Sequence, residues 1–229
     1  MSASAATHQP EGKSMSRRAV LEALSGLLLG MFVSMLASTV VSTSLPVIIH
    51  DLEGTQTAFT WVVTATLLTT AISTPIWGKL ADLTNRKVLY QLAIVIFVLA
   101  TAAAGFSQTP EMLIAFRAVQ GIGAGGLAAL SQVLMADIIS PRERGRYMGL
   151  FGAVMAVATI GGPLLGGVIT DAWGWRWNFF VALPVAVAAL LIVQRTLHIP
   201  VHARKETRID YLGIVLLSAS VSLLLIWVT

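Results

Sequence analysis

Long apolar runs separated by short charged stretches make up most of the chain. Each run is about 20 residues or longer, which is the length a helix needs to cross the hydrocarbon core of a bilayer. The runs lack the alternation of barrel strands, and only helices or closed barrels satisfy their backbone groups in lipid. The pattern therefore predicts an all-α membrane protein. The expected spans are 24–49, 58–78, 88–107, 111–136, 147–171, 177–197 and 211–229.

The sequence around the spans predicts a division of the chain into four parts. Residues 1–23 are small, polar and of mixed charge, which is typical of a disordered cytoplasmic tail. Residues 24–197 hold six spans, and residues 198–210 form a short linker to the seventh span at 211–229. Because the chain stops at the end of that span without a tail, we expect it to be truncated.

The composition excludes several classes of protein. The chain is 56% hydrophobic and 11% charged, whereas about a quarter of the residues of a soluble domain are charged. A large soluble helical protein would still need a charged exterior, so this alternative fails. The chain contains no cysteine, which excludes disulfides, thiol catalysis and thiolate metal sites.

The basic residues predict a topology instead of a nucleic-acid site. Thirteen of the 15 Lys and Arg residues fall in the tail and in alternate loops, and the positive-inside rule assigns these loops to the cytoplasm. The opposite loops carry an interfacial belt of tryptophans, namely Trp61, Trp173, Trp175 and Trp177. We therefore expect a multi-pass protein of the cell membrane that contacts lipid, has a cytoplasmic N-terminus and binds no nucleic acid.

The most charged turn lies between the second and third spans and reads Gly78-Lys-Leu-Ala-Asp82-Leu-Thr-Asn85-Arg86-Lys87. Asp82 and Arg86 are four residues apart, so they can pair on one face of a helical turn, and Lys87 can reach lipid phosphates. The segment resembles the G-x-L-A-D-x-x-G-R-[RK] loop of major facilitator superfamily transporters. Asn85 stands where that family usually has glycine. Because asparagine tolerates a left-handed backbone, we expect the turn to be kept.

Arg117 is the one basic residue that lies away from the ends of a predicted span. At 1.5 Å per residue it lies about 9 Å from the start of its helix near Glu111, where an unpaired charge costs about 2.5 kcal/mol or more. It is therefore a functional candidate, and the alternative is a side chain that snorkels to the outer surface.

The segment Arg117-Ala-Val-Gln120-Gly121-Ile-Gly-Ala-Gly125 resembles the R-x-x-Q-G-x-G-x-G segment of drug:proton antiporters in the same superfamily. The resemblance implies that Arg117 lines a central cavity and takes part in proton transfer. Gly121 and Gly125 also form a G-x-x-x-G face, which permits close helix packing without any transport role.

The fifth span contains Gly161-Gly162-Pro163-Leu-Leu-Gly166-Gly167. It resembles the G-x-x-G-P-x-x-G-G antiporter motif, which implies export instead of import and a seal between this helix and the other half of a transporter. The alternative is a packing kink, since proline frees a backbone carbonyl and glycine permits a bend.

Asp137 ends the fourth span beside the basic loop that contains Arg142, Arg144 and Arg146. We expect Asp137 to pair with Arg86 and to tie two cytoplasmic loops together in an outward-facing state. A solvated surface aspartate is the alternative.

The first span contains Leu36-Ala37-Ser38-Thr39-Val40-Val41-Ser42-Thr-Ser-Leu-Pro46. It resembles the L-D-x-T-[IV]-V-N-x-A-L-P signature of drug:proton antiporters with fourteen helices. Ala37 replaces the aspartate that is a candidate proton-binding group in that branch, and Ser42 replaces the asparagine. All eleven Asp and Glu residues lie in tails, loops or helix ends, so proton coupling would need a carboxylate beyond Thr229.

Polar groups of the first, second and fourth spans are weak candidates for a cavity wall, with Trp61 at its outer rim. These residues are Ser38, Thr39, Ser42, Thr64, Arg117 and Gln120. The four histidines form no metal pair, and no Walker lysine or activated nucleophile occurs. We therefore expect no metal, no cofactor and no enzyme activity.

The resemblance covers about residues 20–229. It implies the N-terminal six-helix bundle of the major facilitator fold plus a seventh helix, from an exporter of drugs or other hydrophobic small molecules. Such an exporter would work by proton antiport and alternating access against a C-terminal half. Two alternatives stay open. One is a non-transporting half-bundle that acts as a sensor or assembly partner. The other is an exporter of a specific metabolite without proton coupling through this half.

Overall fold

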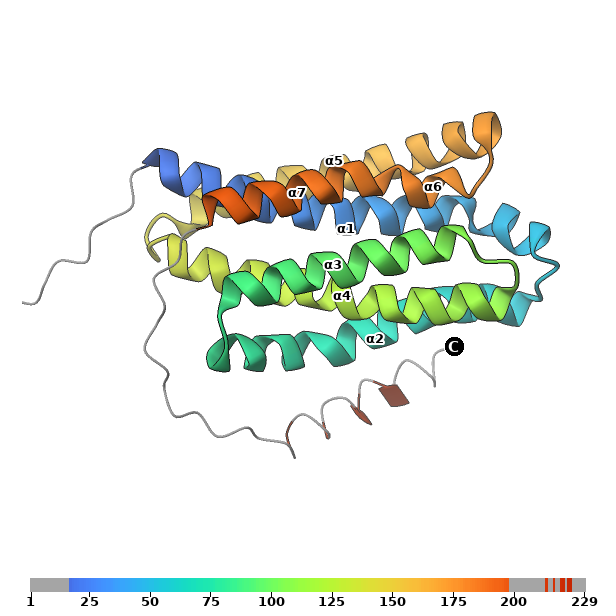
Figure 1. The fold of residues 1–229 in the computed structure, drawn as a ribbon, viewed down its shortest axis with the longest axis horizontal. Helices are drawn as coiled ribbons and strands as arrows, with labels where there is room; N and C mark the ends of the chain where they lie inside the picture. The colour runs from blue at the N-terminus through green and yellow to red at the C-terminus, as the bar shows by residue number, and fades with distance from the viewer. Residues whose placement is uncertain (1–16, 198–212, 214–215, 217–218, 221, 224–229) are drawn as a thin grey trace, which may run out of the picture.

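The computed structural model describes residues 17–197, 213, 216, 219–220 and 222–223, and every element in it is an α-helix (Figure 1). The predicted linker at 198–210 lies outside the described residues, as do most of the tail and most of the seventh span. The helices are α1 (Arg17–Asp51), α2 (Gln56–Leu83), α3 (Arg86–Gly105), α4 (Pro110–Ile138), α5 (Arg144–Trp173), α6 (Trp177–Phe180) and α7 (Ala182–Thr196).

Six stretches of the described residues are long and apolar enough to cross a membrane. Helices α1 to α5 make five of them, and α6 together with α7 makes the sixth, Trp177–Thr196. The prediction of an all-α membrane protein with six spans before residue 198 is thus confirmed.

Helix α1 begins at Arg17, so the last seven residues of the predicted tail, 17–23, are helical. Arg18 Nε donates a hydrogen bond to Glu22 Oε1 at 2.9 Å on the exposed side of this first part of the helix. On the other side, Leu24 and Leu27 are buried in the main apolar core. The first turns of α1 are thus amphipathic, and they precede the uniformly apolar part of the span.

Side-chain caps begin three of the helices and explain why the turns occur where they do. Thr55 Oγ1 accepts a hydrogen bond from Ala58 N at the start of α2, and Thr109 Oγ1 accepts one from Met112 N at the start of α4. Asn85 caps α3, and its Oδ1 accepts from the backbone N–H groups of the second and third residues after it. Each cap satisfies helix donors that otherwise lack a partner.

The expected left-handed backbone at Asn85 is wrong. Its φ is −65° and its ψ is 112°, which is an extended conformation open to any residue. Asparagine therefore serves here through its side-chain oxygen, which a glycine lacks.

The helices lie side by side in two groups (Figure 1). Helices α5, α6 and α7 pack with α1, while α2 and α3 both pack on α4, and α1 also contacts α4. Helices α2 and α5 are the least buried of the spans. The bundle thus has α1 and α4 in its interior and leaves much of α2 and α5 uncovered.

Tyr90 of α3 links α1, α3 and α4 in the core. Its buried hydroxyl donates to Leu27 O at 3.1 Å and accepts from Ser131 Oγ at 3.2 Å. Gly30 makes room for the ring, since a methyl group there would lie 2.3 Å from the Tyr90 oxygen. This contact joins the two groups of helices.

Candidate functional site

A cavity of about 190 Å³ lies near the midpoints of the long helices, and most of its wall is apolar. Helices α1, α2 and α4 provide most of the lining, and α3 and α5 add one residue each. Substrate sites of transporters built from two bundles lie at the same depth. The lining residues are Met31, Ser34, Met35, Ser38, Thr66, Leu67, Thr70, Phe97, Arg117, Gln120, Ala124, Leu127, Ala128 and Met155.

Arg117 lines this cavity and is only 3% exposed, so its side chain does not snorkel to the outer surface. Its Nη1 donates a hydrogen bond to Gln120 Oε1 at 2.6 Å, while its Nε makes no hydrogen bond with the part of the chain that the structure describes. Among the described residues, no Asp or Glu forms an ion pair with Arg117. The guanidinium is therefore a buried cation held by a neutral amide.

Thr101 of α3 completes a chain of hydrogen bonds behind Arg117. Gln120 Nε2 donates to Thr101 Oγ1 at 2.7 Å, and Thr101 Oγ1 donates to Phe97 O at 2.6 Å. The side chains of Arg117, Gln120 and Thr101 are polar and buried, and Phe97 takes part through its backbone oxygen. Thr101 was not among the predicted site residues, although it is the one serine or threonine in α3.

The glycines of α4 bring three helices close together. A methyl group at Gly121 would lie 2.5 Å from Thr66 O of α2, and one at Gly125 would lie 2.7 Å from Thr70 O. On the other side, Gly123 approaches the backbone nitrogen of Phe97 in α3. The glycines therefore set the distance between α4, which carries Arg117 and Gln120, and its neighbours α2 and α3.

Threonines of α2 reach across this close contact. Thr66 Oγ1 donates to Arg117 O at 3.2 Å, and Thr70 Oγ1 donates to Gly121 O at 3.1 Å. Both residues also line the cavity. The sequence predicted Thr64 and Trp61 of this helix at the cavity instead, because the direction in which each α2 residue faces depends on how α2 packs.

The structure places the weak cavity candidates differently from one another. Ser38 lines the cavity. Thr39 instead faces α5, where its hydroxyl donates to Ala158 O at 3.2 Å, and Ser42 is exposed and bonds Ser38 O of its own helix. Thr64 is buried outside the cavity lining, and Trp61 is 39% exposed in the first turns of α2.

The glycine and proline motif of α5 faces two ways, and the predicted seal against another half stays a prediction. A methyl group at Gly162 would lie 2.6 Å from Thr39 Cβ, and one at Gly166 would lie 2.8 Å from Val40 O. These two glycines therefore pack on α1 within the same bundle. Pro163 is exposed, and Gly167 has no neighbour that a methyl group would meet.

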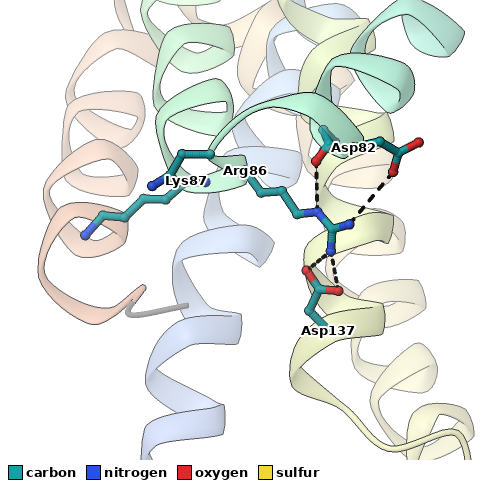
Figure 2. A network of polar contacts seen from close by, with 6 residues as sticks. Asp82, Arg86, Lys87 and Asp137 are labelled. Atoms are coloured by element: carbon teal, nitrogen blue, oxygen red, sulfur yellow. Dashed lines mark hydrogen bonds and ion pairs between the residues drawn. The ribbon is translucent and has the colours of Figure 1, made fainter. Parts of the chain in front are cut away.

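At the other end of the bundle, Arg86 joins three elements (Figure 2). Its Nη1 binds both carboxylate oxygens of Asp137 at the end of α4, its Nη2 lies 3.8 Å from Asp82 Oδ1, and its Nε donates to Ala81 O at 3.1 Å. The two expected pairs are present, and only 15% of the Asp137 side chain is exposed. A single guanidinium thus connects α2, α3 and α4.

Lys87 points away from this network toward α7 (Figure 2). Its Nζ donates to Gln194 O at 2.7 Å, and Gln91 Nε2 bonds the Gln194 side chain. Gln194 O belongs to the last turn of α7, whose carbonyls lack helical partners. Lys87 is therefore engaged with the protein, and its predicted contact with lipid phosphates stays a prediction, while Gly78 of the same motif has open space around it.

Comparison with known proteins identifies the family of this bundle. Residues 27–228 match the model of the Major Facilitator Superfamily. The chain belongs to this superfamily. That membership makes it part of a family of membrane transporters, not of enzymes.

Two relatives in this superfamily come from Bacillus subtilis (strain 168). The multidrug transporter protein MdtP is 39% identical over 187 residues, which cover 82% of this chain and 34% of the relative. Multidrug resistance protein 3 is 36% identical over 196 residues, which cover 86% and 38%. The chain thus spans about a third of the length of the curated relatives that it matches.

A solved superfamily transporter has the same fold. The human organic anion transporter MFSD10 (TETRAN) aligns with a TM-score of 0.73 at 18% identity, over 90% of this chain and 55% of that one. The described helices therefore form one half of a Major Facilitator Superfamily fold. The number of fourteen helices for the whole protein stays a prediction.

Proposed function

We propose that this bundle is the N-terminal half of a transporter that exports drugs or other hydrophobic small molecules. The observation that carries the proposal is the mostly apolar cavity at mid-depth, where Arg117 is the one charged residue among the described residues of the lining. Its relatives include proteins named for multidrug transport and multidrug resistance.

In this proposal, export proceeds by alternating access. The six-helix bundle rocks against a second bundle and opens the cavity to each side of the membrane in turn. The Arg86 contacts to Asp82 and Asp137 hold the cytoplasmic ends of α2, α3 and α4 together in the outward-facing state. Gly167 and Pro163 remain available on α5 for contact with the second bundle.

We further propose that the protein lies in the cell membrane with its N-terminus in the cytoplasm and that protons drive export. Arg117 and Gln120 would respond to proton binding because it changes the charge in and around the cavity. A second candidate is an exporter of a specific metabolite without proton coupling through this half. It is favoured by the position of every Asp and Glu of the described spans at a helix end or turn.

Transport of a fluorescent hydrophobic dye into everted membrane vesicles tests the proposal. The vesicles carry the complete reading frame that contains this chain, and the interior is made acidic to drive antiport. We expect dye uptake that stops when nigericin removes the pH gradient. Arg117→Gln should reduce uptake about tenfold or more, since it removes a charge-assisted bond, while Arg18→Gln at an exposed position should leave it unchanged.

Each other outcome selects a different function. Uptake that persists without a pH gradient would favour the uncoupled exporter. No uptake of any member of a dye and drug panel, with normal insertion in the membrane, would reject export and favour the non-transporting half-bundle.

A further inference from the structure

The cavity holds a cation for which the described residues provide no counter-charge. Among the described residues, Arg117 is 3% exposed, its Nε has no hydrogen-bond partner, and its Nη1 donates to the neutral side-chain oxygen of Gln120. A buried charge without a partner is costly in a membrane protein, and such charges are usually paired or face a ligand. A negatively charged group of a ligand would therefore balance the charge of this site.

No acid of the described residues pairs with Arg117. Asp82 and Asp137 pair with Arg86, and Asp51 pairs with Arg176. None of the described residues that line the cavity is acidic. Ala37, on the neighbouring α1, is 1% exposed and packs in the apolar core, so this helix supplies no carboxylate at that depth.

The rest of the wall fits an apolar body. Met31, Met35 and Met155 offer flexible thioethers, and Phe97 and Leu127 add rigid apolar surface. Methionine adapts to ligands of irregular shape, and a guanidinium matches a carboxylate with two parallel hydrogen bonds. Charge and shape thus favour one kind of molecule, which has an apolar body and a single anionic head.

We infer that the cavity binds amphipathic organic anions, with a carboxylate or similar oxyanion on Arg117 and the apolar part against Phe97 and the methionines. The physiological meaning of this site, export of such anions, rests on the proposed function. The binding preference itself does not. An organic cation of the same shape would meet the positive charge of Arg117 without compensation and should bind weakly.

Three probes of one shape test the preference. They are naphthalene-2-carboxylate, naphthalene-2-carboxamide and naphthalen-2-yl-trimethylammonium. Their binding to the full-length protein in nanodiscs is measured by equilibrium dialysis, with empty nanodiscs as the blank. We expect the carboxylate to bind about tenfold or more tightly than the amide, since its hydrogen bonds are charge-assisted, and the ammonium to bind most weakly.

Substitutions then assign the preference to Arg117. Arg117→Gln should remove the tenfold advantage of the carboxylate and leave amide binding within about twofold. Arg117→Lys keeps the charge but loses the planar fork, so it should retain part of the advantage. Arg18→Gln, the same change at an exposed cytoplasmic arginine, should alter neither.

Equal binding of the three probes to the wild-type protein would overturn the inference, and it would show that an acid outside the described residues already pairs with Arg117. A carboxylate preference that survives in Arg117→Gln would overturn it as well. Carboxylate binding without any transport would keep the anion site and reject the proposed export. Transport of dyes without carboxylate preference would do the reverse.

Discussion

Thr101 shows how one hydroxyl orients a pair of residues, one of which it does not touch. Its proton is donated to Phe97 O, so its oxygen is left to accept from Gln120. The amide nitrogen of Gln120 therefore turns toward Thr101, and the amide oxygen turns toward Arg117. A neutral side chain on α3 thus sets which end of Gln120 the buried guanidinium meets.

We predict that Thr101→Val destabilises the protein and weakens the function of Arg117. The variant leaves a buried N–H of Gln120 without an acceptor, which costs about 1–3 kcal/mol. Thr101→Ser keeps the hydroxyl and should stay close to wild type. Denaturant unfolding in detergent and the vesicle transport assay measure the two effects. Normal stability and transport in Thr101→Val would contradict the orienting role.

Helices α2 and α4 touch through glycine, and this contact determines where the cavity lies. Gly121 and Gly125 remove the side chains that would separate the two backbones. The close approach lets the hydroxyls of Thr66 and Thr70 bond carbonyls of α4. Between helices in lipid, such packing and hydrogen bonding replace the hydrophobic driving force.

Gly121→Ala should push α2 away from α4, because its methyl group would meet the Thr66 backbone oxygen at 2.5 Å. Overpacking of this kind costs about 1–3 kcal/mol. Gly78→Ala is the matched control within α2, where no atom lies near the new methyl group. Alanine there should be neutral or stabilising by up to about 1 kcal/mol. Denaturant unfolding of both variants checks the difference, and equal stability would show that α2 can shift without cost.

The two ends of the bundle are held by different chemistry. At one end, Arg86 joins carboxylates of α2 and α4. At the other, Asp51 accepts from Trp175 Nε1 at 2.8 Å and pairs with Arg176, which stacks on the Trp175 ring at 4.1 Å and donates to Ser107 O. The second network joins the end of α1 to the loops before α4 and α6. Its tryptophan is typical of an interfacial position.

The absence of cysteine makes the proposed orientation directly testable. Gln108 lies in the exposed turn between α3 and α4, and Thr84 lies in the exposed turn between α2 and α3. In intact cells, a membrane-impermeant maleimide should label Gln108→Cys and should label Thr84→Cys only after permeabilisation. The reverse pattern would place the N-terminus outside and reject the topology drawn from the basic residues.

Several features could be predicted because they depend on local sequence. The spans follow from apolar length, and the Asp82–Arg86 pair follows from helical spacing. The Asp137–Arg86 pair was also expected, because Asp137 ends the fourth span, Arg86 precedes the third, and the basic residues assign both turns to the same side. The Asn85 cap was not predicted, although Asn before a helix is a common start signal. The glycine at this position in the family pattern predicted a left-handed backbone instead.

Which face of each helix meets its neighbour could not be predicted in the same way. In α2 and α5 apolar and small residues occupy every side, so the sequence carries little amphipathic signal to orient them. Gly162 and Gly166 therefore packed on α1 instead of remaining free for another half, and Thr66 and Thr70 lined the cavity in place of Thr64. The composition, and the order of apolar and charged segments along the chain, decide that it crosses a membrane and how often. Packing of α3 on α4 decides that Arg117 lies buried without a counter-charge from the described residues, because it brings Thr101 behind the local Arg117–Gln120 pair and no described acid pairs with the guanidinium.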